Sequence, residues 1–446
     1  MLERMDWVTD AAGALSTPLG RLVLLLVAIY VVLVVYLKRS GRYADHVLFY
    51  GPILALKTTR VGFFDIFRRI SSPLRLYASL GVVAVALVSF FVAFSLLFSF
   101  QLLLVTRPEP TQIIAPQNIL LIPGVNEFVP GTLAVWLALV ITLVVHEFGH
   151  GILSRVEGIR VKAAGVLLAV IPIGAFVEPD EEELFKAPRG ARMRMYGAGI
   201  TNNFVVGLLS ILLMIALVGM VTPVTTPIIH GVYKDSPAYN ASVPSNAVVV
   251  ALNGTPVHAR DEIGRLLSPS RPGDIAELTV EASGQRSTHR LVLAPWPGNV
   301  SASGFMGIEY YDGAALQAYV RQSFNPFGIL QYLFMPFNPS PDARALRILG
   351  FPGASASAYL DAPFVGFWTL VHLCFWSGWI NLNVGIFNAL PMLPFDGGYI
   401  FKEAVGSLLA RIRLERLSPY IVGGLSWLMA VTMISLIALP YLFQFF

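Results

Sequence analysis

Long apolar stretches constrain the fold of this 446-residue chain more than any other feature of its sequence. Each approaches or exceeds the roughly 20 residues that a helix needs to cross the hydrocarbon core of a membrane. Only a helix or a closed barrel satisfies its own backbone in lipid, so these stretches predict a polytopic α-helical membrane protein with about six transmembrane helices. The stretches run at about residues 22–37, 78–105, 132–153, 196–221, 363–390 and 419–446.

The composition agrees with a chain that lies in a lipid bilayer. Hydrophobic residues make up 55% and charged residues only 13%, against about 25% charged residues in soluble proteins. Despite the net charge of +4, no basic stripe interleaved with aromatic residues occurs, so no nucleic-acid partner is expected. The single cysteine, Cys374, excludes disulfides within the chain and a thiolate zinc site, which leaves histidine and carboxylate as metal ligands.

Basic residues are concentrated in three loops between the apolar stretches. Residues 38–75, 155–194 and 402–416 together hold 19 of the 31 lysines and arginines. Loops rich in Lys and Arg face the cytoplasm, so these three are predicted to be cytoplasmic. Both chain ends and the region between the fourth and fifth stretches are then expected outside the cell membrane. A basic cluster instead of a small-residue cleavage site follows the first stretch, so we expect this stretch to be retained.

The region at 227–312 has the pattern of a small α/β domain. AVVVALNGTPV contains an Asn-Gly turn, AELTVEAS and STHRLVLAP flank a glycine turn, and ARDEIGRLL is a helix candidate. This region divides the membrane core in two. The predicted organisation is an N-terminal helix and cytoplasmic loop at 1–77, membrane core at 78–222, the outer domain at 227–312, an interfacial connector at 313–361 and further core at 362–446.

The sequence HEFGH at 146–150 lies inside an apolar stretch, where charged residues are costly and usually functional. Histidines four apart share one face of a helix, so His146 and His150 can bind one zinc ion. Glu147 would then lie next to the reacting water and could take its proton during peptide hydrolysis. In the alternative interpretation, two buried histidines form hydrogen bonds across a helix bundle with a glutamate partner, which leaves the five-residue pattern unexplained.

A third ligand must come from elsewhere, and the best candidate is Asp396 in NVGIFNALPMLPFDGGYIF, residues 383–401. Prolines and glycines interrupt the helix around it, so the carboxylate can line a polar cavity. HEFGH ends one inward-running helix and Asp396 ends another, so both are expected at one depth, toward the cytoplasmic side. Alternatively, Asp396 simply reaches water at its helix end. His372 is a rival ligand that should lie nearer the outer face.

HEFGH in a membrane helix, NALPMLPFDGG downstream and a soluble module between them together resemble the site-2 protease family of intramembrane zinc metalloproteases. The resemblance implies that Asp396 is the third zinc ligand. It also implies that Asn388 holds the substrate backbone or the oxyanion; a helix-breaking asparagine that satisfies local carbonyls is an equal alternative. AGITNN at 198–203 resembles a further family element, Ala-Gly-Pro-x-x-Asn, with Ile200 in place of the proline, which makes Asn203 a candidate substrate contact.

Two more segments extend the resemblance. IPIGAFVEP at 171–179 resembles the family's membrane-dipping β-hairpin, which offers an edge strand to an unwound substrate and makes Gly174 a candidate substrate contact. DSPA at 235–238, ALNGTPV and PGD resemble a PDZ module, so the outer domain is expected to be PDZ-like. The resemblance therefore implies a zinc-dependent endopeptidase whose substrates are transmembrane proteins in the lipid bilayer.

Two other functions fit part of the pattern. Another class of membrane zinc protease would combine HExxH with a glutamate from a later helix. A metal-binding scaffold or transporter without proteolytic activity would place His146, His150 and Asp396 on an ion path and recruit a partner through the PDZ-like domain. Glu147 favours an enzyme, because ion transport does not need a base at that position.

Overall fold

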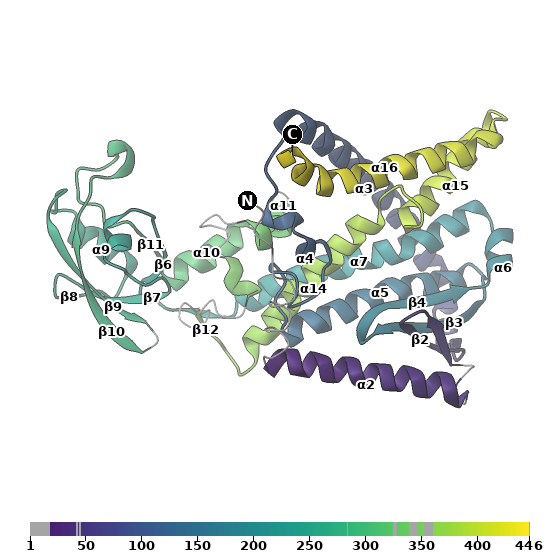
Figure 1. Ribbon diagram of the computed structural model, residues 1–446, viewed down its shortest axis with the longest axis horizontal. Helices are drawn as coiled ribbons and strands as arrows, with labels where there is room; N and C mark the ends of the chain where they lie inside the picture. Colours follow the sequence, from purple (N-terminus) through teal and green to yellow (C-terminus); the bar gives the residue numbers. More distant parts are fainter. Residues whose placement is uncertain are drawn as a thin grey trace. The chain divides into compact units, whose positions relative to one another are not determined.

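A computed structural model describes residues 18–41, 43, 46–282, 284–323, 328–338, 346–351 and 360–445 (Figure 1). The chain divides into two compact units. The first comprises residues 1–104, 140–203 and 385–436, and the second comprises residues 105–139, 204–384 and 437–446. The first 17 residues of the predicted N-terminal segment, and residues 324–327, 339–345 and 352–359 of the predicted connector, lie outside the described residues.

Among the described residues, five helices are long and apolar enough to cross a membrane, which confirms a helical membrane protein. They coincide with five of the six predicted stretches. At the first stretch the structure has α2 (Pro18–Ser40), a 23-residue helix with many exposed leucines and valines. This helix is not one of the five, so the count of six spans stays a prediction, as does the orientation of the spans. The five are Gly62–Thr106, containing α3 (Ser71–Thr106), α5 (Leu133–Val156), α7 (Arg189–Val218), α14 (Phe367–Asn388), and Glu415–Phe445, containing α16 (Ser418–Leu442).

The first unit contains a four-stranded antiparallel sheet in the order β1-β2-β3-β4. The hydroxyl of Tyr30 on α2 lies 2.6 Å from the carbonyl oxygen of Pro52 and 2.8 Å from that of Leu168, so it holds α2 against the turn between β1 and β2 and the end of β3. Among the described strands, β4 pairs only with β3, so its other edge carries no strand. The strands are β1 (Val47–Tyr50), β2 (Ile53–Thr58), β3 (Val161–Ala169) and β4 (Ile171–Pro179).

A buried ion-pair network joins the ends of three helices in the first unit. The side chain of Glu157, only 5% exposed, contacts Arg194 of α7 at 2.8 Å and Arg75 of α3 at 3.4 Å. Arg75 also donates a hydrogen bond to the carbonyl oxygen of Val156, the last residue of α5, at 2.9 Å. A buried carboxylate with two cationic partners is held firmly, so this network fixes the helices on which the candidate site lies.

The second unit contains a sheet in the order β10-β9-β7-β6-β11, with β8 paired to β7. The predicted strands and the predicted helix, α9 (Arg260–Leu267), form where the sequence places them. Asn253 and Gly254 both have positive φ, as a tight Asn-Gly turn requires. The PDZ-like character of this region stays a prediction. The strands are β6 (Ile228–Val232), β7 (Ala247–Leu252), β8 (Thr255–Pro256), β9 (Ile275–Ala282), β10 (Gln285–Val292) and β11 (Ile308–Tyr311).

Aromatic residues of α14 form the main core of the second unit. Trp376 and Trp379 are almost fully buried, and their indole N–H groups donate to the carbonyl oxygens of Gly350 and Leu333. Buried tryptophans need such partners for their one polar atom. His372, the rival ligand, lies in this unit with Nε2 3.3 Å from the carbonyl oxygen of Ile348. Smaller helices here include α10 (Gly313–Ser323) and α11 (Gly328–Phe334).

Candidate metal centre

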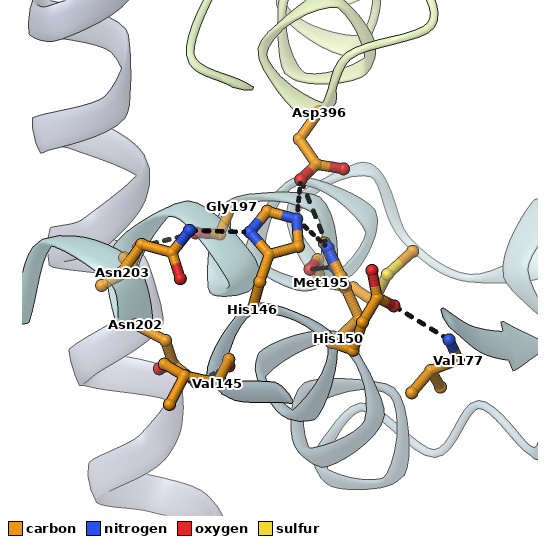
Figure 2. A network of polar contacts seen from close by, with 11 residues as sticks. Val145, His146, His150, Val177, Met195, Gly197, Asn202, Asn203 and Asp396 are labelled. Atoms are coloured by element: carbon orange, nitrogen blue, oxygen red, sulfur yellow. Dashed lines mark hydrogen bonds and ion pairs between the residues drawn. The ribbon is translucent and has the colours of Figure 1, made fainter. Parts of the chain in front are cut away.

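Three of the predicted residues converge in the first unit. His146 and His150 lie on one face of α5, with their Nε2 atoms 3.2 Å apart. Asp396 is the first residue of α15 (Asp396–Arg411), and its Oδ2 lies 3.1 Å from Nε2 of His146 and 3.2 Å from Nε2 of His150 (Figure 2). The helical spacing accounts for the two histidines, and the start of α15 brings the carboxylate to them.

The geometry of this cluster fits a zinc ion. Its three ligand atoms form a nearly equilateral triangle, with sides of 3.1 to 3.2 Å. In a tetrahedral zinc site with bonds of about 2.0–2.1 Å, neighbouring ligand atoms lie about 3.3–3.4 Å apart. Asp396 Oδ2 is buried, with no hydrogen-bond donor among the described residues. Lone pairs that converge in this way repel one another, so a cation between them would stabilise the cluster.

Hydrogen bonds to the other ring nitrogens define the orientation of both histidines. Nδ1 of His150 lies 2.9 Å from the carbonyl oxygen of Met195, so it carries the proton and leaves the Nε2 lone pair for a metal. Nδ1 of His146 lies 3.2 Å from the side-chain amide of Asn203. Amide oxygen and nitrogen are assigned from such contacts. The structure directs the amide nitrogen of Asn203 to this ring atom and leaves the amide oxygen without a partner among the described residues (Figure 2). Rotating the amide by 180° would let the oxygen accept the Nδ1 proton and would set the same tautomer for His146.

Replacing Asn203 by alanine is expected to lower zinc affinity by about 10- to 100-fold, because a ligating histidine then loses its orienting partner. Competition with a chromophoric chelator measures this. Asn202→Ala is the matched control: Asn202 donates to the carbonyl oxygen of Val145 and accepts from Tyr77, and forms no hydrogen bond with either imidazole. An equal loss of affinity in both variants would assign the effect to helix packing instead of to the hydrogen bond with His146.

Glu147 contacts the edge of the sheet. Its Oε2 accepts a hydrogen bond from the backbone N–H of Val177 at 2.9 Å. Val177 lies on β4 opposite Ala164 of β3, and its N–H is directed to Glu147 and not to β3. The carboxylate therefore lies against the edge of β4 that carries no other described strand.

A cavity of about 780 Å³ opens onto the cluster. His146, Glu147, His150 and Asp396 line it, together with Asn388, the last residue of α14. Gly174 is on β4, paired with Leu167, and does not belong to the residues that line this cavity. The structure thus brings four predicted residues and Asn388 to one cavity, and places Asn203 behind His146.

The backbone of α7 passes directly against the two rings. A methyl group built on Gly199 would lie 2.6 Å from Nε2 of His150 and 2.8 Å from Cε1 of His146, and one on Gly149 would lie 2.7 Å from the Ala198 carbonyl. Gly199 belongs to the AGITNN motif that the sequence analysis noted. The hydrogen bonds of Val177 with Glu147 and of Met195 with His150 were not predicted. Val177 and Met195 act through backbone atoms, so no side-chain pattern marks them.

The family comparison agrees with this geometry. The model of peptidase family M50 matches residues 134–431, about two thirds of the chain, and the match includes the whole cluster of His146, His150 and Asp396. This chain belongs to peptidase family M50. The predicted relationship to the site-2 protease family is therefore confirmed.

Individual relatives of this M50 chain are distant. An uncharacterized protein of Methanocaldococcus jannaschii is 23% identical over 386 residues, 85% of this chain and 84% of that protein. The membrane-bound transcription factor site-2 protease homolog of Arabidopsis thaliana is 29% identical over 208 residues, 45% of this chain and 39% of that protein. Putative zinc metalloprotease LL2128 of Lactococcus lactis is 28% identical over 242 residues, 52% and 54% of the two chains. The family match and the names of the last two relatives support a membrane zinc metalloprotease with Zn²⁺ as its cofactor.

Proposed function

We propose that this M50 protein is an intramembrane endopeptidase that hydrolyses peptide bonds in or near the transmembrane segments of membrane-protein substrates. The observation that carries the proposal is the convergence of His146, His150 and Asp396, with Glu147 beside them, in one cavity. His146, Glu147 and His150 lie on α5, a helix long and apolar enough to span a membrane. Family membership supports the protease class, and this location supports cleavage at membrane depth.

His146, His150 and Asp396 would hold zinc through two Nε2 atoms and Oδ2. Zinc supplies Lewis-acid polarisation of the scissile carbonyl and of the attacking water. Met195 keeps His150 in the neutral tautomer that binds a metal, and Asn203 contacts the corresponding ring nitrogen of His146. We therefore assign Asn203 a positioning role in place of the substrate contact expected from the sequence.

Glu147 would act as the general base and then as the general acid. Its Oε2 is held by the N–H of Val177, which leaves Oε1 to accept a proton from the attacking water. As the water oxygen bonds to the carbonyl carbon and the C–N bond breaks, the same carboxyl group returns the proton to the leaving amine nitrogen. One residue therefore serves both proton transfers without moving away from β4.

The free edge of β4 would bind the substrate as an added strand. Extended backbone pairs with an exposed strand edge through main-chain hydrogen bonds, so a transmembrane helix must unwind locally before it can bind. Ala175 lies two residues before Val177, and its backbone groups therefore face the same edge, next to Glu147. Gly174 adjoins this position and stays a candidate substrate contact. Asn388 lines the cavity and would hold the substrate backbone or the oxyanion.

The test uses the full-length chain reconstituted in liposomes with a panel of single-span substrates and with soluble peptides of the same flanking sequences. We expect chelator-sensitive cleavage of at least one membrane substrate, with product masses that place the cut in or next to the apolar segment. Cleavage of the soluble peptides alone would contradict the intramembrane proposal. A zinc-loaded chain that cleaves nothing in a broad panel would favour the scaffold or transporter.

A further inference from the structure

A second cavity, of about 500 Å³, lies in the first unit between α7, α15 and the start of α16. It shares no lining residue with the larger cavity at the metal centre. Its walls combine charged side chains with apolar ones, and the proposed peptidase mechanism uses none of them. The cavity therefore needs an explanation of its own.

Two of the cations that line this cavity have no partner among the described residues. Arg192 binds Glu403 through two contacts of 2.6 and 2.8 Å, and its third nitrogen donates to two carbonyl oxygens, so this pair is satisfied. Arg189 and Lys402 are exposed at the rim and form no ion pair or side-chain hydrogen bond within the described part of the chain. The other charged residue that lines the cavity is Glu415. Outside the pair of Arg192 and Glu403, the cavity therefore has two cations and one carboxylate.

The polar groups of the cavity face one small space. A methyl group built on Gly406 would lie 3.8 Å from the hydroxyl oxygen of Ser418 and 3.9 Å from Nη2 of Arg189. The missing side chain at Gly406 thus leaves room between a hydroxyl donor on α16 and a guanidinium on α7. A phosphate group accepts from both kinds of donor, and arginine matches its oxygens geometrically.

Apolar residues line the same cavity as the polar groups, and one of its helices, α16, also has an exposed apolar surface. Leu393 and Val422 line the cavity beside the polar groups. Farther along α16 the side chains of Trp427, Val431 and Ile434 are 74%, 48% and 65% exposed, as expected for a helix in contact with acyl chains. Gly423 also lines the cavity, and helical spacing places it on the same side of α16 as Trp427 and Ile434, so an acyl chain can run from the cavity along this side of the helix. Basic pockets between transmembrane helices are known sites for anionic lipid headgroups.

We propose that this cavity binds the headgroup of an anionic phospholipid, with the phosphate between Arg189, Lys402 and Ser418 and an acyl chain along α16. A free phosphate would satisfy the same donors but would leave the apolar wall without a partner. The combination of free cations and apolar surface is what favours the lipid.

The test is native mass spectrometry of the full-length chain released from mixed micelles of phosphatidylglycerol and phosphatidylcholine. Wild type is expected to retain phosphatidylglycerol selectively. Each basic group near an anionic headgroup contributes a factor of about five in affinity, so Arg189→Gln with Lys402→Gln should lower retention about 25-fold. Arg411→Gln with Arg413→Gln is the matched control, because it removes two exposed charges, from the end of α15 and from the turn after it, that do not line the cavity.

A variant that is expected to increase lipid retention keeps the test independent of folding defects. Glu415→Gln removes the one free carboxylate and should raise retention of phosphatidylglycerol about fivefold, a gain that misfolding cannot produce. Equal losses in the two double variants, or equal retention of both lipids by wild type, would overturn the proposal. Complete displacement of the lipid by excess inorganic phosphate would show that the acyl chain adds no binding energy. This result would identify a small-anion site and would also overturn the proposal.

Discussion

The Glu147→Gln variant is expected to keep its zinc and to lose about 10²- to 10⁴-fold in cleavage rate. Glutamine has the size of glutamate and retains an oxygen that can accept from the N–H of Val177, so the contact with β4 can persist. It cannot accept a proton at neutral pH. Zinc should stay because Glu147 is not one of the three clustered ligand residues. Elemental analysis of the purified chain and initial rates on a reconstituted substrate measure the two quantities.

Glu182→Gln is the matched control, since it makes the same chemical change on α6 (Glu181–Lys186), where the side chain of Glu182 is 84% exposed and forms an ion pair with Lys186. It should cleave at the wild-type rate. Survival of cleavage in Glu147→Gln would remove this residue from the proton transfers. Loss of zinc together with activity would mean that the carboxylate supports the metal, and the division of roles proposed here would be wrong.

The sequence predicted the clustered residues because each carries its chemistry in its side chain. The period of the α-helix places His146 and His150 on one face whatever surrounds them. Asp396 was harder, since its distance from His150 along the chain contains no geometric information. It was located because a carboxylate in an apolar segment interrupted by prolines and glycines can line a polar cavity, and because NALPMLPFDGG resembles the family motif. The predicted depth of the two helix ends agreed with this choice. The structure brings the three groups together.

Contacts made by the backbone could not be predicted in the same way. Val177 reaches Glu147 only because β4 pairs with β3 in one register, and a shift by one residue would direct that N–H toward β3. The segment that forms β1 and β2 was predicted only as part of a cytoplasmic loop, because its partner, β3, lies about a hundred residues later in the chain. Strands of the domain at residues 227–312 were predictable, since their turns contain glycine and their pairing is mostly local.

The second large effect is expected for Gly199→Ala, which should lower zinc affinity by about 100-fold or more. A methyl group at this position would lie 2.6 Å from Nε2 of His150, well inside the 3.5–4.0 Å of an ordinary contact, at the atom that would bind the metal. Relief requires α7 or the ring to move, and either movement also disturbs the hydrogen bond between His150 and Met195. Overpacking of this kind also costs about 1–3 kcal/mol of stability. Chelator competition and thermal unfolding measure the two effects.

Gly197→Ala separates this contact from the general response of α7 to an added methyl group. The same substitution two residues earlier would bring a methyl within 3.1 Å of Cγ2 of Val82 and 3.5 Å of Cδ1 of Ile400, both ends of side chains that can shift. Its zinc affinity should match wild type. If Gly199→Ala bound zinc as tightly as Gly197→Ala, the α7 backbone could not lie against the two imidazoles, and the orientation that Met195 and Asn203 give to those rings would lose its structural basis.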